Sequence, residues 1–160
     1  TLVQKKCPFV EMNRDTIVKC INGLTENTRP AWGIMTPQHL VEHFEFFFRM
    51  TTGEVQTEII TSEKNIEKYQ DSLWTFEDMA KNYQHPLFKK GKTEKLRFDN
   101  LDDAKNAFFL AYDKYIQFFK ENPNAKTANT IFGMLDKYHW HLLNRRHMNH
   151  HFRQFGVLNS

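Results

Sequence analysis

Glycine, proline and cysteine are all scarce in this sequence. Its 160 residues include six glycines, five prolines and two cysteines. Because so few turn-forming residues cannot separate many short strands, the chain is expected to form long helices and not a strand sandwich. Cys7 and Cys20 match no metal or redox spacing and are too few for a disulfide framework. We therefore expect free thiols in a reducing compartment, the cytoplasm.

A long apolar run and a strong charge of one sign are also missing. No segment approaches the roughly 20 apolar residues of a membrane span, and residues 1–6 lack the apolar core of a signal peptide. The formal net charge is +3, with acidic and basic residues interleaved along most of the chain. We therefore expect neither a membrane nor nucleic acid as a partner.

The densest basic stretch runs from Lys89 to Lys92, and Lys95 and Arg97 follow closely. We interpret this stretch as a solvated loop, since charge runs usually face water. The alternative is a rim that attracts an anion or a substrate.

Histidine, by contrast, is abundant. The chain has eight histidines, and five of them lie between His139 and His151. Neutral imidazole binds zinc, nickel, copper and iron well. The clustering of histidines is therefore the feature of this sequence that most needs a functional explanation.

Apolar periodicity and capping residues predict an all-α fold. The expected N-caps are Asp15, Thr36, Ser62, either Asn100 or Asp102, and Asp136, while Gly23, Gly53 and Gly156 follow helix ends. Residues 74–84 are expected to add a short helical turn. Helices are predicted over about residues 15–22, 38–52, 62–73, 103–121 and 137–155. The four longer ones fit an antiparallel four-helix bundle, forming a single domain over residues 1–160 behind a short N-terminal arm at residues 1–13.

Helical projection separates the histidines of the segment 38–52. At about 100° per residue, His43 lies within the apolar arc of this helix, whereas His39 lies near the edge of that arc. We therefore expect His43 to point into the core and His39 to lie closer to solvent.

The last predicted helix presents a histidine face of its own. His147 and His151 are four residues apart, so their rings lie one turn apart and can reach one ion. Asn144 and Gln154 flank this face and could orient ligands or water, or simply pack. His150 lies to the side of this face. It could contact the ligands, face a substrate, or belong to a solvated flank of the helix.

These positions predict a metal site of His43, His147 and His151. Bundles build such sites from inward side chains of facing helices, and three protein ligands leave a coordination position open. A rival ligand set pairs His39 with His43. A third interpretation has no metal, with the histidines satisfying one another by hydrogen bonds.

Two segments resemble a known superfamily. Residues 29–43 (RPAWGIMTPQHLVEH) resemble the first-helix signature of the DinB-like (YfiT-like) metalloenzymes, and residues 147–156 (HMNHHFRQFG) resemble their last-helix motif. More narrowly, both fit a branch known only as a domain of unknown function. Residues 131–135 (IFGML) resemble the turn that leads into that last helix.

The resemblance implies a four-helix bundle with an unusual helix order. It also implies nickel or zinc on His43, His147 and His151. Some relatives are thiol-dependent transferases or isomerases, so a low-molecular-weight thiol is an expected cofactor and a small molecule the expected substrate. The function predicted is a metal-dependent transferase or hydrolase. The alternative is a non-catalytic bundle that binds a metal or a small ligand, in a stress response. The sequence does not decide whether the chain forms a homodimer.

Overall fold

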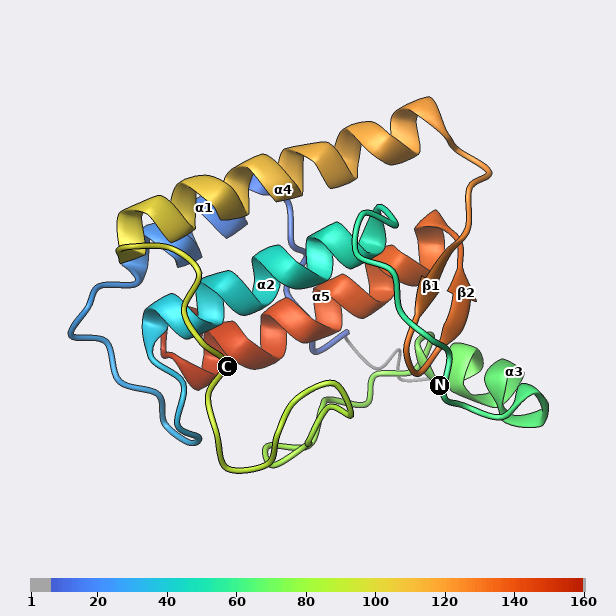
Figure 1. The fold of residues 1–160 in the computed structure, drawn as a ribbon, viewed down its shortest axis with the longest axis horizontal. Helices are drawn as coiled ribbons and strands as arrows, with labels where there is room; N and C mark the ends of the chain where they lie inside the picture. The colour runs from blue at the N-terminus through green and yellow to red at the C-terminus, as the bar shows by residue number, and fades with distance from the viewer. Residues whose placement is uncertain (1–6, 160) are drawn as a thin grey trace, which may run out of the picture.

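The described part of the chain, residues 7–159 of a computed structural model, is mostly helical, which agrees with the prediction of a mostly α-helical fold. Residues 1–6 of the predicted N-terminal arm lie outside the described residues. Figure 1 shows α2 and α5 side by side at the centre, with α4 along one side of them. The elements are α1 (Arg14–Gly23), α2 (Pro37–Thr51), α3 (Glu63–Ser72), α4 (Leu101–Glu121), β1 (Thr127–Asn129), β2 (Gly133–Leu135) and α5 (Lys137–Gln154).

Aromatic side chains form the core between α2 and α4. Phe48 of α2 stacks on Tyr115 of α4 with ring centroids 5.7 Å apart, and Phe108 meets both Phe44 and Phe48 edge to face. All four of these side chains are buried. Such aromatic pairs add about 0.5–1.5 kcal/mol each beyond their burial, so this core holds α2 firmly along its length.

Most of the predicted helix boundaries agree with the structure, but both ends of α1 and the helical turn at residues 74–84 were predicted wrongly. The N-cap of α1 is Asn13 and not Asp15, because the Asn13 Oδ1 accepts a hydrogen bond from Thr16 N at 2.9 Å. Asp15 lies in the first turn, and Gly23 is the last helical residue instead of the one that follows. Residues 74–84 form no helix, only isolated turns.

The hairpin of β1 and β2 was missed by the sequence patterns. The two strands pair antiparallel, with Thr127 opposite Leu135. Each strand has three residues, too few for a period of two to be recognised. Asn129 begins the turn, where its side chain accepts hydrogen bonds from Ile131 N and Phe132 N.

The polar arc of α2 is buried by the segment before α4. Glu42 and Glu45 are each only 6% exposed. The Arg97 guanidinium donates to Glu45 Oε2 at 2.6 Å, and the Arg97 backbone N–H donates to Glu42 Oε1 at 2.5 Å. These bonds fasten the end of the long α3–α4 connection to α2. Within the described residues, no helix is long and apolar enough to cross a membrane.

Candidate metal centre

The start of α2 is defined by Thr36 and His39. Thr36 Oγ1 accepts from His39 N at 3.2 Å, and the His39 ring returns the contact, with Nδ1 3.2 Å from Thr36 N. Pro37 suits the first helical position because its missing N–H needs no partner there. His43 follows one turn later and faces inward from α2.

The start of α5 is defined by Asp136. Its carboxylate accepts from Tyr138 N and His139 N, at 3.1 and 2.9 Å. The helix then runs without interruption to Gln154, so His147 and His151 lie on successive turns of one face.

The structure brings His43, His147 and His151 together. One ligand atom from each of the three side chains lies within 4.8 Å of the others. Nε2 of His43 and Nε2 of His147 are 2.8 Å apart. The His151 ring centroid lies 5.0 Å from that of His43 and 4.7 Å from that of His147. Three imidazoles from two antiparallel helices therefore converge on one point.

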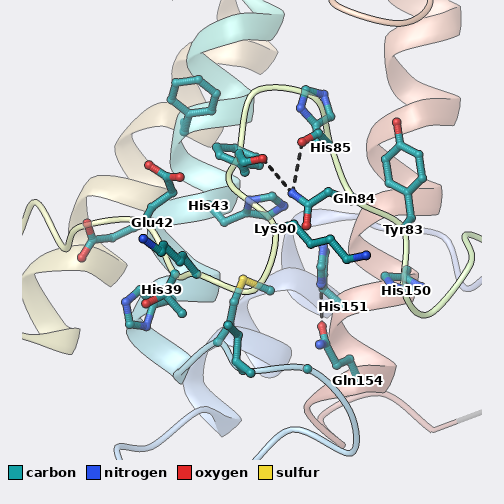
Figure 2. Close-up of a pocket in the computed structure, with 18 of the residues that line it drawn as sticks. His39, Glu42, His43, Tyr83, Gln84, His85, Lys90, His150, His151 and Gln154 are labelled. Carbon is teal, nitrogen blue, oxygen red and sulfur yellow. Dashed lines mark hydrogen bonds between the residues drawn. The ribbon is translucent and has the colours of Figure 1, made fainter.

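Gln154 orients His151. The Nδ1 of His151 lies 2.7 Å from Gln154 Oε1, and Gln154 Nε2 donates to the Trp32 carbonyl at 2.8 Å (Figure 2). A glutamine oxygen can only accept, so the proton of neutral His151 is on Nδ1 and Nε2 keeps its lone pair for an ion. The prediction that Gln154 lies beside the site agrees with this geometry.

A cavity of about 650 Å³ opens above the three histidines. Its walls come from α2, α5, the loop before α2 and residues 79–97 of the α3–α4 connection. Aromatic rings enclose its inner end, where Phe47 lies 4.9 Å from the His43 ring and Phe88 lies 5.6 Å from it. The histidines are thus reached from the cavity and shielded elsewhere.

This enclosure keeps the imidazoles neutral. Burial lowers the pKa of His151 to about 3, against an ordinary value of 6.5. Burial also lowers the pKa of His43 and His147 well below 6.5, and repulsion by the neighbouring histidines acts in the same direction. Neutral imidazole is the form that binds metals, so the three side chains are ready to act as ligands at neutral pH.

The donor set and spacing fit a divalent ion. Nitrogen ligands suit zinc and nickel. With zinc–nitrogen bonds of about 2.0–2.1 Å, two ligands of one ion lie at most about 4.2 Å apart. Ligand atoms within 4.8 Å of one another therefore need side-chain shifts of less than about 1 Å to share an ion. The three residues could hold a metal, and this ligand set stays a prediction for metal-binding measurements.

The other two predicted histidines, His39 and His150, both line the cavity. His39 lines the cavity but caps α2 and lies outside the three-histidine group, so the geometry does not favour the rival set. His150 also lines the cavity and is 6% exposed, so the solvated-flank interpretation was wrong. Its ring packs on Trp32 at 5.5 Å.

Asn144 lies away from the site. Its side chain is buried and donates to Thr51 Oγ1 at 3.3 Å, near the other end of α2. The helical projection placed Asn144 close to His151 in angle, but seven residues separate the two by about 10 Å along the axis. Of the two interpretations, this contact agrees with ordinary helix packing.

His85 and the basic stretch line the cavity as well. No periodic signal in the sequence marks His85, because it follows no regular element. The His85 ring packs on Phe47 and Phe88, with centroids 5.3 and 5.4 Å away, and burial lowers its pKa to about 4. Lys90 and Lys92 are exposed at the cavity, the position of the alternative rim.

Comparison of the chain with protein-family models, with curated proteins and with solved structures found no match. Its function must therefore be argued from the site.

Proposed function

We propose that this chain is a divalent-metal-dependent enzyme, a transferase or hydrolase, that holds nickel or zinc on His43, His147 and His151. The observation that carries this proposal is the convergence of three neutral imidazoles at the floor of a cavity. A closed structural site would need a fourth protein ligand. Among the described residues, the group of potential ligands contains only these three histidines.

The same proposal places the chain in the DinB-like superfamily, with a four-helix bundle. Support comes from the arrangement of α2 and α5, which run antiparallel and supply the histidines, and of α4, which packs on α2 (Figure 1). Support also comes from residues 29–43 and 147–156, whose resemblance to the superfamily motifs implies the same histidine set. α3 buries none of its residues and lies at the edge of the fold.

A divalent ion on three histidines supplies Lewis acidity, which polarises a carbonyl or lowers the pKa of a bound water or thiol. The protein side chains hold the ion, orient its ligands and exclude water. His43, His147 and His151 act as ligands only, and Gln154 fixes the tautomer of His151. Phe47 and Phe88 exclude water from one side of the site, which strengthens electrostatic interactions within it. The cavity would admit a small-molecule substrate and a low-molecular-weight thiol.

One observation favours the non-catalytic alternative, in which the ion only holds a small ligand. Glu42 is a carboxylate of the cavity lining, but its oxygens accept from Arg97 N and from Gln38 Nε2. A carboxylate engaged in this way has fewer lone pairs left to contact a substrate. An enzyme would then need another group, such as a bound thiol or water, for proton transfer.

Metal analysis of His147→Ala tests the proposal. The protein is purified without an affinity tag, treated with chelator, loaded with zinc or nickel and desalted, and its metal content is measured by mass spectrometry. We expect about one ion per chain for the parent and less than about a tenth for His147→Ala, because two ligands hold an ion far more weakly than three.

His141→Ala is the matched control. His141 lies on the same helix but is exposed, with Nε2 2.7 Å from Glu11 Oε1. This variant should keep the full metal content, and circular dichroism should show unchanged helix in both variants. A parent protein that takes up no metal, or a His147→Ala variant that retains it, would contradict the proposed site. Retention in His147→Ala with loss in His39→Ala would favour the rival ligand set.

A further inference from the structure

The lining of the cavity carries an excess of positive charge. The α3–α4 connection contributes most of it, while the floor is formed by neutral histidines. Five basic residues stand against two acidic ones, namely Lys81, Lys90, Lys92, Lys95 and Arg97 against Glu42 and Glu94. An anionic group entering the cavity would therefore be attracted.

Two of the five cations are already engaged. Arg97 pairs with Glu42 and Glu45, and the Lys81 ammonium lies 4.8 Å above the Trp32 ring. Lys90, in contrast, has no hydrogen bond or ion pair with any residue that the structure describes. In Figure 2 its side chain extends along the cavity, with the ammonium on the side of His150 and His151. Lys90 is the cation best placed to meet a ligand inside the cavity.

His150 is a second polar group without a partner. Its side chain is only 6% exposed and faces the cavity, yet neither ring nitrogen hydrogen-bonds to a described residue. The ring nitrogens are not sealed off from the cavity, so a ligand that enters it can reach them. Neutral imidazole always has one N–H to donate, whichever tautomer is present.

Part of the cavity lining is apolar. Phe47, Phe88 and Met35 line it, and Phe46 meets Phe88 with centroids 6.0 Å apart. Burial of an aromatic or aliphatic body against these side chains contributes about 25 cal/mol per Å². The cavity thus combines a polar end with an apolar wall.

We propose that the cavity selects a small molecule with an anionic group on an apolar body, and that Lys90 and His150 bind the anionic group. The inference rests on the cavity of the proposed function and names the substrate class of that site. A carboxylate or a phosphate would accept from the Lys90 ammonium and from the His150 N–H. The apolar body would lie against Phe47 and Phe88, over the three histidines.

Titration of the labelled protein by heteronuclear NMR tests this selection. The probes are phenylacetate, phenyl phosphate and the neutral phenylacetamide, each added to metal-free and to zinc-loaded protein. We expect at least one of the two anions to bind about tenfold more tightly than the amide, since charge-assisted hydrogen bonds are roughly twice as strong as neutral ones. The comparison of the two anions distinguishes a carboxylate from a phosphate substrate.

The variants Lys90→Met and His150→Leu test whether these two side chains bind the anionic group. Each should reduce the preference for the anion to within about threefold, because loss of the donor weakens the charge-assisted hydrogen bond of the anion more than the neutral one of the amide. The matched control is Lys89→Met, which removes the neighbouring charge from a residue outside the cavity lining and should leave the preference intact. Because His150 is buried, its variant is first checked for native chemical shifts, and Lys90→Met provides the same test at an exposed position.

Failure of this inference can be told apart from failure of the metal site. Equal affinity for anions and amide, or a preference unchanged in Lys90→Met, would overturn the inference. A preference that requires zinc and ignores Lys90 would mean that the ion holds the anion, and the proposed function would stand. A protein without zinc uptake but with a Lys90-dependent preference would support the inference and remove the metal chemistry.

Discussion

At the scale of single residues, the orientation of His151 depends on a glycine that is distant in sequence. Gly33 has a φ of +83°, and a Cβ placed on it would lie 2.9 Å from Gln154 Nε2. That nitrogen donates to the Trp32 carbonyl, while the oxygen of the same amide holds His151. The loop before α2 can approach Gln154 only because residue 33 has no side chain.

Gly33→Ala should therefore weaken metal binding. The added methyl group displaces the Gln154 amide and frees the His151 ring, and loss of such an outer hydrogen bond typically costs 10–100-fold in metal affinity. The left-handed backbone adds about 1–2 kcal/mol of strain. Zinc affinity is measured by competition with a chromophoric chelator, and stability by urea denaturation.

Gly91→Ala separates the backbone strain from the displacement of the Gln154 amide. Gly91 also has a positive φ, +71°, but a Cβ there would meet nothing within 4 Å. It should share the backbone strain while keeping the parent zinc affinity. Equal zinc affinity in both variants would show that the Gln154 contact does not support the site.

At the scale of elements, four of the five helices of the described residues begin at a side chain that accepts from a first-turn N–H, while Ser62, the expected cap of α3, makes no such bond. Thr36, Asn100 and Asp136 were expected as caps, Asn100 with Asp102 as its alternative, and each accepts from the backbone in the structure. α1 differs because two suitable residues, Asn13 and Asp15, lie close together. Sequence preference alone does not rank them, since both residue types cap well.

Alanine substitutions of Asn13 and Asp15 should show which of the two residues caps α1. Asn13→Ala is expected to lower the free energy of unfolding by about 1 kcal/mol, because Thr16 N loses its acceptor. Asp15→Ala removes only a favourable charge from the first turn, about 0.3–1 kcal/mol, and that loss should shrink in high salt. Both are measured by urea denaturation at low and high salt. A larger and salt-independent loss in Asp15→Ala would assign the cap to Asp15.

At the scale of the whole molecule, burying neutral histidines makes stability depend on pH. The pKa of His85 is lowered to about 4 and that of His151 to about 3, from 6.5 in the unfolded chain. Below pH 6.5 the unfolded chain therefore holds more protons than the native one. This contribution to stability is complete above pH 6.5 and is lost as the pH falls towards 4 and then 3.

We expect the metal-free protein to lose up to about 1.4 kcal/mol per pH unit for each such histidine between pH 6 and 4. Urea denaturation in the presence of a chelator, at several values from pH 7 to pH 4, measures this loss. His85→Phe removes one titrating group and should give a shallower dependence. Unfolding free energies that are equal at pH 7 and pH 5 would mean that the histidines are not buried in their neutral form.

The sequence by itself determined the helices that bear the histidines and the side of each helix on which they lie. Capping residues and a period of 3.6 residues are local signals, and they predicted α2, α5 and the inward positions of His43, His147 and His151. The same reasoning could not place Asn144, because a projection discards distance along the helix axis. It also missed β1 and β2, whose three residues each are too short for a periodic pattern.

Only the tertiary structure decided what surrounds the three histidines. His85, Lys90 and Arg97 lie in a long connection without periodicity, and their positions follow from how that connection crosses α2 and α5. The burial of His150 likewise depends on Trp32, a residue 118 positions earlier in the chain. Contacts over such sequence distances are set by packing and not by local preference. The grouping of the three histidines was therefore predictable from the sequence, whereas the cavity around them was not.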